Sequence, residues 1–244
     1  MTSPSGSVSS SERTTVDTPD GPMPCHRWLP PGGAGPGLVL FQEIFGVSNY
    51  IKKRSADLAA LGYVVLAPEI YWRLGKYDFD VVGLEVINEA MGFAGRVDWD
   101  LAVADGQAAF QGLRSQDEVT GGVGLIGFCF GGGLAFNVAA LEEPDVLVSY
   151  YGSALGRLLG LADRVTAPSL HHFGLADSYI DLDTIWAVKA AVESGPDGRF
   201  ETHEGADHAF DNPMPMLHHP AASKAAWATT TAFLAEHLPP TTRQ

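Results

Sequence analysis

The chain has 244 residues, enough for one domain with a large buried core, and no shift in composition divides it. Its 29 acidic and 15 basic residues give a net charge of −14, which disfavours nucleic acid and anionic membranes as partners. No window approaches the ~20 apolar residues that span a bilayer, and the Ser-rich start lacks the features of a signal peptide. Two cysteines build no disulfide framework, so a reducing cytoplasm is the simplest expected compartment.

The first predicted elements form an antiparallel hairpin. Two β-forming runs, 14–17 and 23–29, flank Pro19-Asp20-Gly21, which is a typical turn sequence. Cys25 lies in the second run, where a buried thiol behaves as a small apolar side chain. We expect this hairpin to open the domain.

Strands and helices then alternate along the chain. Strands are predicted at 38–41, 63–67, 123–126, 146–150, 168–174 and 198–202, and helices at 48–61, 98–113, 134–141, 182–192 and 221–237. The apolar run Leu38-Val39-Leu40-Phe41 is typical of a strand that is buried on both faces. This alternation predicts the α/β class, with a mostly parallel central sheet flanked by helices. Residues 74–97 are less regular, and we expect them to line or cover a pocket.

The domain boundaries follow from these elements. Residues 1–13 precede the hairpin, are rich in Ser and are predicted to form a flexible tail. One domain is predicted over residues 14–238, followed by a C-terminal tail of residues 239–244. The sequence contains no internal repeat and no heptad array that would suggest another architecture.

A cysteine stands at a glycine-rich turn between a predicted strand and a predicted helix. The turn reads Gly127-Phe128-Cys129-Phe130-Gly131-Gly132, which is the nucleophile elbow of α/β-hydrolases with Cys in place of the usual Ser. Glycines suit this turn because two chain segments approach closely beside the nucleophile. The alternative is a buried cysteine without chemical function. A phosphate-binding loop fits poorly, because no Lys-Ser/Thr pair follows the glycines.

Polar residues that follow later strands supply partners for Cys129. In a parallel sheet, the ligand site lies beyond the carboxyl ends of the strands. Asp177 and His208 follow the last two predicted strands, so the chain order is nucleophile, acid, base, as α/β-hydrolases require. His208 would take the thiol proton, while Asp177 would hold the imidazole in the useful tautomer. The rival acids are Asp181, Asp183 and Asp207.

Acyl transfer also needs hydrogen-bond donors for the developing oxyanion. We expect them to be the backbone N–H groups of Phe130, directly after the nucleophile, and of Ile44, in the loop after the first parallel strand. Glu43 precedes Ile44 in that loop. Beside a thiol, its carboxylate could accept the thiol proton or, when charged, disfavour the thiolate. The alternative is a loop carboxylate held by backbone N–H groups.

Three segments together resemble the dienelactone hydrolase family (carboxymethylenebutenolidase). They are Gln42-Glu43-Ile44-Phe45-Gly46-Val47, the Cys129 turn, and Gly205-Ala206-Asp207-His208-Ala209-Phe210. The resemblance implies a single-domain α/β-hydrolase fold with Cys129, Asp177 and His208 as the triad, and with Glu43 interacting with the thiol until substrate displaces it. It also implies hydrolysis of a small enol-lactone or related activated ester through an acyl-enzyme, without a cofactor. We expect a monomer or a small homo-oligomer.

The resemblance further implies that Arg73, beside Trp72 and Tyr71 in one loop, binds a substrate carboxylate. The alternative for Arg73 is a solvated loop cation. A second such arginine is implied four residues after the catalytic histidine, where this chain has Asn212. The substrate is therefore expected to be less anionic than a dienelactone, or differently held. Groups that could compensate are Lys76, His218 and His219.

Two other functions stay open at this point. A thioesterase or general carboxylesterase would use the same triad on different acyl substrates, and a non-catalytic binding protein could retain the scaffold. We expect no metal site, because the pairs His171-His172 and His218-His219 lack further ligands at metal-binding spacing.

Overall fold

The centre of the molecule is a mostly parallel sheet. The computed structural model describes residues 11–80 and 83–240. Within them, eight strands form one sheet in the order β1-β2-β4-β3-β5-β6-β7-β8. The strands are β1 (Glu12–Thr18), β2 (Gly21–Trp28), β3 (Gly35–Phe41), β4 (Val64–Pro68), β5 (Val119–Phe128), β6 (Leu147–Tyr150), β7 (Ser169–Gly174) and β8 (Gly198–His203). From β4 to β8 in this order the strands run parallel, while β1 and β2 join the sheet as an antiparallel hairpin.

The hairpin forms where the turn sequence predicts it. Thr18 pairs with Gly21, whose φ of 126° suits the one residue type without a Cβ. Cys25 is buried in β2, as expected for an apolar thiol. Since β1 begins at Glu12, residues 12 and 13 of the predicted tail belong to the strand. The rest of the predicted tails, except residues 11, 239 and 240, lies outside the described residues.

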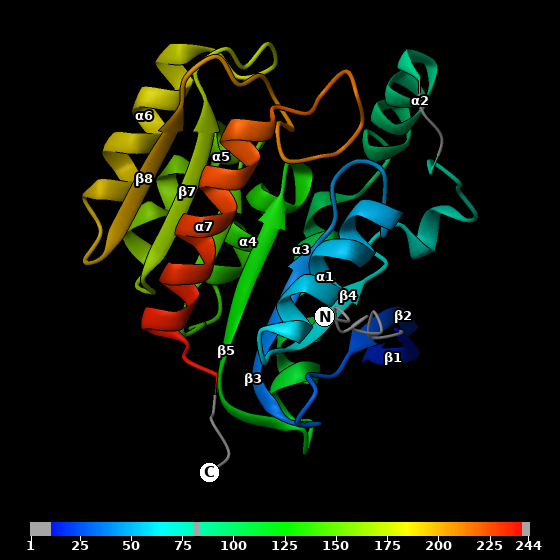
Figure 1. Ribbon diagram of the computed structural model, residues 1–244. Helices are drawn as coiled ribbons and strands as arrows, with labels where there is room; N and C mark the ends of the chain where they lie inside the picture. The colour runs from blue at the N-terminus through cyan, green and yellow to red at the C-terminus, as the bar shows by residue number, and fades with distance from the viewer. Residues whose placement is uncertain (1–10, 81–82, 241–244) are drawn as a thin grey trace, which may run out of the picture.

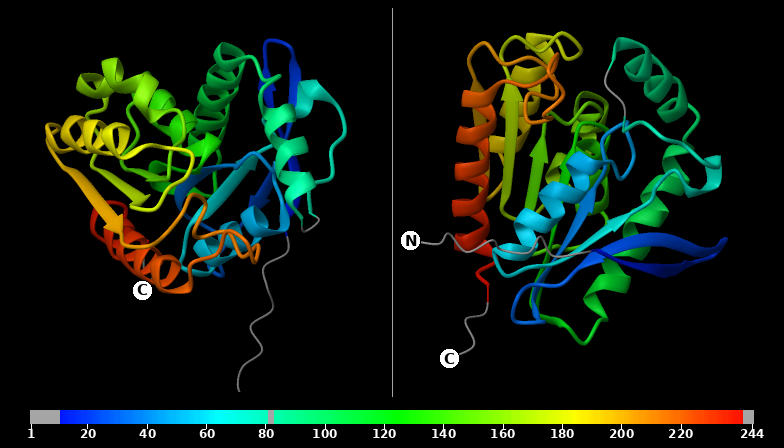
Figure 2. Two further views of the ribbon diagram at one scale, coloured as in Figure 1. Left: turned by 90° about the horizontal axis from the view of Figure 1, so that it is seen from above. Right: turned by 45° about the vertical axis from the view of Figure 1, so that its right-hand side comes forward.

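Helices cover both faces of the parallel sheet (Figure 1). They are α1 (Asn49–Ala60), α2 (Leu84–Ala94), α3 (Trp99–Arg114), α4 (Phe130–Ala139), α5 (Leu155–Leu158), α6 (Leu182–Glu193) and α7 (Pro220–His237). The view along the sheet in Figure 2 shows α1 and α7 on one face and α3, α4 and α6 on the other. The predicted α/β architecture with flanking helices is therefore confirmed.

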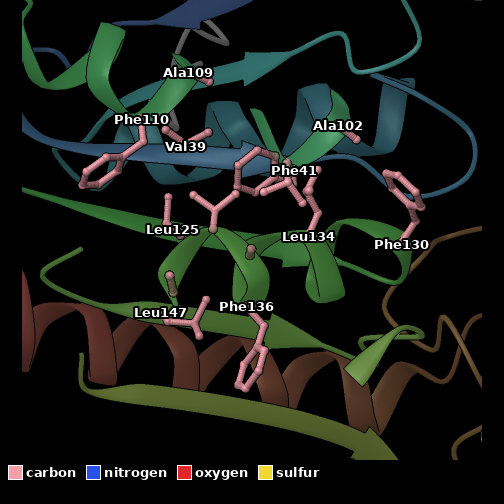
Figure 3. Close-up of a cluster of buried hydrophobic side chains, with 14 of the residues drawn as sticks. Val39, Phe41, Ala102, Ala109, Phe110, Leu125, Phe130, Leu134, Phe136 and Leu147 are labelled. Carbon is pink, nitrogen blue, oxygen red and sulfur yellow. The ribbon is translucent and has the colours of Figure 1, made fainter. Parts of the chain in front are cut away.

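The sheet is buried on both faces, and its central strand β3 has no polar side chain. Successive side chains of a strand point to opposite faces. Val39 and Phe41 of β3 accordingly pack in the cluster under α3 and α4, whereas Leu38 and Leu40 pack in the cluster under α1 and α7. Figure 3 shows Val39 and Phe41 beside Leu134 of α4, all of them fully buried. This packing fixes the strand ends from which the functional loops leave.

The sequence did not predict three helical segments. Residues 74–97 were expected to be less regular, yet they contain the 11-residue helix α2, whose N-cap, Gly83, offers no capping side chain. The short α5 and the 3₁₀ segment Leu159–Arg164 were also missed. Short helical turns have weak sequence patterns, because fewer than two turns give no apolar periodicity to read.

Helix α2 lies apart from the two helical layers. Figure 1 shows it at the same end of the molecule as the arrowheads of β5 and β7. It packs on a separate apolar cluster that includes Phe45, Tyr71, Phe79 and Ile87. This helix therefore covers the carboxyl ends of the strands, where the ligand site of a parallel sheet is expected. In the part of the chain that the structure describes, no helix combines the length and apolar character needed to cross a membrane.

Candidate active site

Cys129 occupies a strained turn between β5 and α4. Its backbone has φ 52° and ψ −114°, a conformation that L-residues rarely adopt. The turn is closed tightly: a Cβ on Gly127 would lie 2.0 Å from the backbone oxygen of Gly131, and one on Gly131 would lie 2.4 Å from that of Phe41. Only glycine fits these two positions, and the turn therefore holds the sulfur at the end of β5.

His208 and Asp177 lie in line with the Cys129 sulfur. Nε2 of His208 is 3.1 Å from Sγ of Cys129, and Nδ1 of His208 is 2.8 Å from Oδ2 of Asp177. The other oxygen of Asp177 accepts the backbone N–H groups of Tyr179 and Ile180, each at 2.9 Å. The loops after β5, β7 and β8 thus bring together three residues that are far apart in the sequence.

The three rival acids have other positions. Oδ1 of Asp207 accepts the backbone N–H groups of Ser178 and His208, so this carboxylate joins the two loops. Asp181 caps α6 by accepting the N–H of Thr184, and Asp183 is exposed in the first turn of the same helix. Of these four carboxylates, Asp177 is the one that contacts a ring nitrogen of His208.

The His208 ring is packed between two tyrosines and carries a perturbed pKa. The rings of Tyr151 and Tyr179 lie 5.3 and 5.2 Å from it. Burial alone would lower the pKa of His208, but the neighbouring Cys129 sulfur and the Asp177 carboxylate outweigh it, so the pKa lies well above its usual value. The electrostatics of this site accordingly favour an imidazolium next to the sulfur.

The two backbone N–H groups that were expected to bind an oxyanion belong to Phe130 and Ile44. Phe130 is the first residue of α4, and the first amides of a helix have no intrahelical partner. Ile44 lies in the loop after β3 and lines the same cavity as Cys129. Among the residues that the structure describes, neither N–H donates to a protein acceptor.

Glu43 is buried in the wall of the same cavity but does not bond to the sulfur. Its two oxygens accept hydrogen bonds from the Tyr151 hydroxyl at 3.2 Å and from the Asn212 amide at 2.6 Å. Burial raises the pKa of Glu43 to about 7, although these two hydrogen bonds act in the opposite direction. Neither partner followed from the sequence, although Tyr151 comes directly after a predicted strand, where polar side chains gather at a ligand site.

The Cys129 sulfur opens into a cavity of about 160 Å³. Apolar side chains form most of its wall. The lining residues are Glu43, Ile44, Phe45, Ile87, Met91, Cys129, Ser153, Tyr179, His208, Ala209 and Leu217. Because Ile87 and Met91 come from α2, the expectation that residues 74–97 line a pocket is confirmed. The site thus places a thiol at a mainly apolar cavity wall.

Arg73, which was expected to bind a substrate carboxylate, does not line this cavity. Its guanidinium forms an ion pair with the buried carboxylate of Asp105 on α3 and another with Asp20 in the hairpin turn. Trp72 is turned the same way, and its indole N–H donates to Asp105 at 2.9 Å. Tyr71 is fully buried behind the site and donates to the backbone oxygen of Ile44 at 3.0 Å. Asp105 attracts the loop cation because a buried carboxylate requires a partner.

The three groups that could compensate for the missing second arginine do not line this cavity either. Lys76 lines a different cavity, next to the hairpin. His219 caps α7 by accepting the N–H of Ala222, and His218 is exposed. Within residues 11–80 and 83–240, no group of three or more His, Cys, Asp or Glu side chains is arranged to hold a metal ion.

The fold and this line of Cys, His and Asp define an α/β-hydrolase. Residues 27–238 match the model of the dienelactone hydrolase family, and the chain belongs to that family. The chain is 33% identical over 215 residues to a carboxymethylenebutenolidase of Pseudomonas sp. strain P51, covering 88% of this chain and 90% of the relative. It is 31% identical over 182 residues to that of Pseudomonas putida, covering 74% and 77% of the two chains.

Solved structures agree with this assignment. A dienelactone hydrolase-like promiscuous phosphotriesterase from metagenomic libraries has a TM-score of 0.78 at 25% identity, with 95% of this chain and all of that chain covered. Dienelactone hydrolase of Anabaena variabilis has the same fold, with a TM-score of 0.70 at 19% identity over 95% of this chain and 100% of that chain. The protein is thus a hydrolase of ester or lactone bonds in small molecules, and a purely non-catalytic binding role is set aside.

Proposed function

We propose that the protein hydrolyses enol-lactones or related activated esters through a Cys129-His208-Asp177 triad and an acyl-enzyme. The sulfur attacks the carbonyl carbon after its proton has passed to His208, and a C–S bond forms. The ring C–O bond then breaks, and the enolate leaves with the proton that His208 returns. Water, deprotonated by His208, attacks the thioester, and the C–S bond breaks to release the acid and restore Cys129.

One observation carries this proposal: the continuous line from the carboxylate of Asp177 through the imidazole of His208 to the sulfur at the cavity wall, with contacts of 2.8 and 3.1 Å. Both lie within the range for a hydrogen-bonded base and its nucleophile. The N–H groups of Ile44 and Phe130 would bind the oxyanion, each worth about 3 kcal/mol of transition-state stabilisation. A thiolate with an enolate leaving group suits activated esters better than amides.

Glu43 would modulate the thiol through charge rather than contact. It shares the cavity wall with Cys129 and is held by Tyr151 and Asn212. With a pKa of about 7, it changes its charge in the neutral range. A charged Glu43 disfavours a thiolate in the same cavity, and a protonated Glu43 does not. The resting thiol is in this way restrained without a direct hydrogen bond.

The experiment compares kcat/KM for a dienelactone, its methyl ester, a thioester and a simple aryl ester. Cys129→Ala is expected to abolish turnover of all four, and Cys129 should carry the acyl group when the wild-type enzyme is quenched and its mass measured. A general carboxylesterase would turn over the aryl ester as well as either enol-lactone, and a thioesterase would prefer the thioester. Either result would refute the enol-lactone assignment, while residual turnover by Cys129→Ala would refute the nucleophile.

A further inference from the structure

The wall of the cavity that holds Cys129 contains few charged side chains. Among the described residues, no lysine or arginine lines the cavity that holds Cys129, and its one carboxylate, Glu43, is almost completely buried. A carboxylate that enters an apolar site loses its hydration, and this loss is compensated only by a cation or by several hydrogen bonds. The one cation that the wall beside Cys129 can offer is the His208 imidazolium, and its two nitrogens are already engaged by the Asp177 carboxylate and the Cys129 sulfur.

Two arginines that could be considered as partners of a substrate carboxylate are bound to other groups. Arg73 is paired with Asp105 and Asp20. Arg54 is paired with the fully buried carboxylate of Asp211. Turning either guanidinium toward the cavity would leave a buried carboxylate without its partner, which costs several kcal/mol.

Asn212 cannot take the place of a guanidinium either. Its amide nitrogen donates to Glu43 at 2.6 Å, and its amide oxygen accepts the N–H of Met214 at 2.9 Å. Both ends of the side chain are therefore engaged in holding the wall and its loop. The net charge of −14 adds a long-range field that repels anions from the whole molecule.

We propose that this site prefers small uncharged esters or lactones over substrates whose acyl part carries a carboxylate. This inference rests on the triad chemistry proposed above. A cavity of about 160 Å³ resembles the apolar cavities that bind a single benzene ring, so the acyl part is expected to be about one ring in size. Apolar side chains such as Ile44, Ile87 and Leu217 would bind that ring by excluding water.

The test uses two rigid substrates that differ in one group. p-Nitrophenyl 4-methylbenzoate and p-nitrophenyl 4-carboxybenzoate have the same leaving group and similar size, and neither can cyclise. After each kcat/KM is divided by the rate of hydroxide hydrolysis, the methyl substrate should be preferred by about 100-fold. Equal kcat/KM values, or a preference for the carboxylate, would overturn the inference while Cys129-dependent turnover still supported the proposed function. If neither ester were turned over faster than by Cys129→Ala, the proposed function itself would fail.

A second measurement asks whether charge is the cause. Met91 lies on α2 at the cavity and is 44% exposed, so a longer polar side chain can be placed there without entering the core. Met91→Arg should raise the ratio of carboxylate to methyl turnover by about 10-fold, because a guanidinium binds a carboxylate strongly. The matched control, Met91→Gln, makes the side chain polar at nearly the same length without adding a charge and should leave the ratio unchanged. The same ratio in both variants would overturn the electrostatic basis of the selection.

Discussion

Asn212 donates a hydrogen bond of 2.6 Å to Glu43, and both side chains are buried. On the other side, Tyr151 joins Glu43 to Tyr50 through a hydroxyl contact of 3.4 Å, and Tyr50 donates to Asp211. A carboxylate that is fully buried keeps a raised pKa even with two donors, since neither donor carries a charge. Within this network, the pKa of Glu43 lies at about 7, so its carboxyl group changes charge near neutral pH.

The raised pKa of Glu43 makes stability depend on pH. Because its folded pKa, about 7, lies above the ordinary value of 4.5, the folded protein holds this proton more tightly than the unfolded chain. The contribution is fully present below about pH 4.5 and is lost as the pH rises through about 7. In Glu43→Gln the side chain does not titrate, so this loss does not occur. Between about pH 5 and about pH 8, the unfolding free energy of the variant should therefore rise by roughly 2–3 kcal/mol relative to that of the wild type.

Urea unfolding of the two proteins at both pH values measures this difference. Asp183→Asn, a change at an exposed carboxylate in the first turn of α6, is the control and should show the same difference between the two pH values as the wild type. Parallel stability curves for Glu43→Gln and the wild type would mean that Glu43 is ionised throughout this range. The hydrogen bonds of Tyr151 and Asn212 would then outweigh the cost of burial.

Two neighbouring aspartates give a matched test of the triad. Asp177→Asn should reduce kcat by about 10³–10⁴-fold, because the amide no longer holds His208 in the tautomer that accepts the thiol proton. Asp207→Asn keeps an oxygen for the N–H groups of Ser178 and His208, and should cost less than about 10-fold. Steady-state kinetics on one aryl ester separate the two. A larger loss in Asp207→Asn would reverse the assigned roles.

The sequence predicted the sheet and the meeting of Cys129, Asp177 and His208, because both follow from local patterns. Apolar runs mark buried strands, and the carboxyl ends of parallel strands meet at one edge of a sheet. Residues placed just after such strands must lie near one another, whatever their separation in the chain. The Gly-x-Cys-x-Gly turn similarly requires a tight approach that only glycine permits.

The partners of Glu43 and Arg73 could not be predicted in this way. Asn212 lies 169 residues from Glu43, and Asp105 lies 32 residues from Arg73 on a helix of another layer. No local pattern encodes which long side chain turns toward which buried carboxylate, since the choice depends on how α3 packs against the loop. Arg73 therefore stands at the position that the family motif implies, but its guanidinium pairs with the Asp105 carboxylate.

The pairing of Arg73 with Asp105 predicts a structural role for this arginine. Arg73→Ala should lower the unfolding free energy by about 3 kcal/mol, because it leaves the Asp105 carboxylate, whose side chain is 1% exposed, without a cation. The preference between the methyl and carboxyl benzoates should not change. Asp20→Ala removes the exposed partner of the same arginine and should cost under about 1 kcal/mol. A selective rise in KM for the carboxyl ester in Arg73→Ala would instead mean that Arg73 reaches the substrate.

The elbow glycines predict the last pair of variants. A Cβ on Gly131 would lie 2.4 Å from the backbone oxygens of Phe41 and Gln42, so Gly131→Ala must push α4 away from the end of β3. We expect a loss of about 3 kcal/mol in stability together with a fall in kcat, because the same shift moves the N–H of Ile44 away from the oxyanion. Gly92→Ala in α2 meets no atom within 4 Å and should instead stabilise the protein by about 0.5–1 kcal/mol. Urea unfolding and aryl ester kinetics on both variants test this contrast, and a Gly131→Ala enzyme with wild-type kcat would show that the turn tolerates a wider spacing than the contact implies.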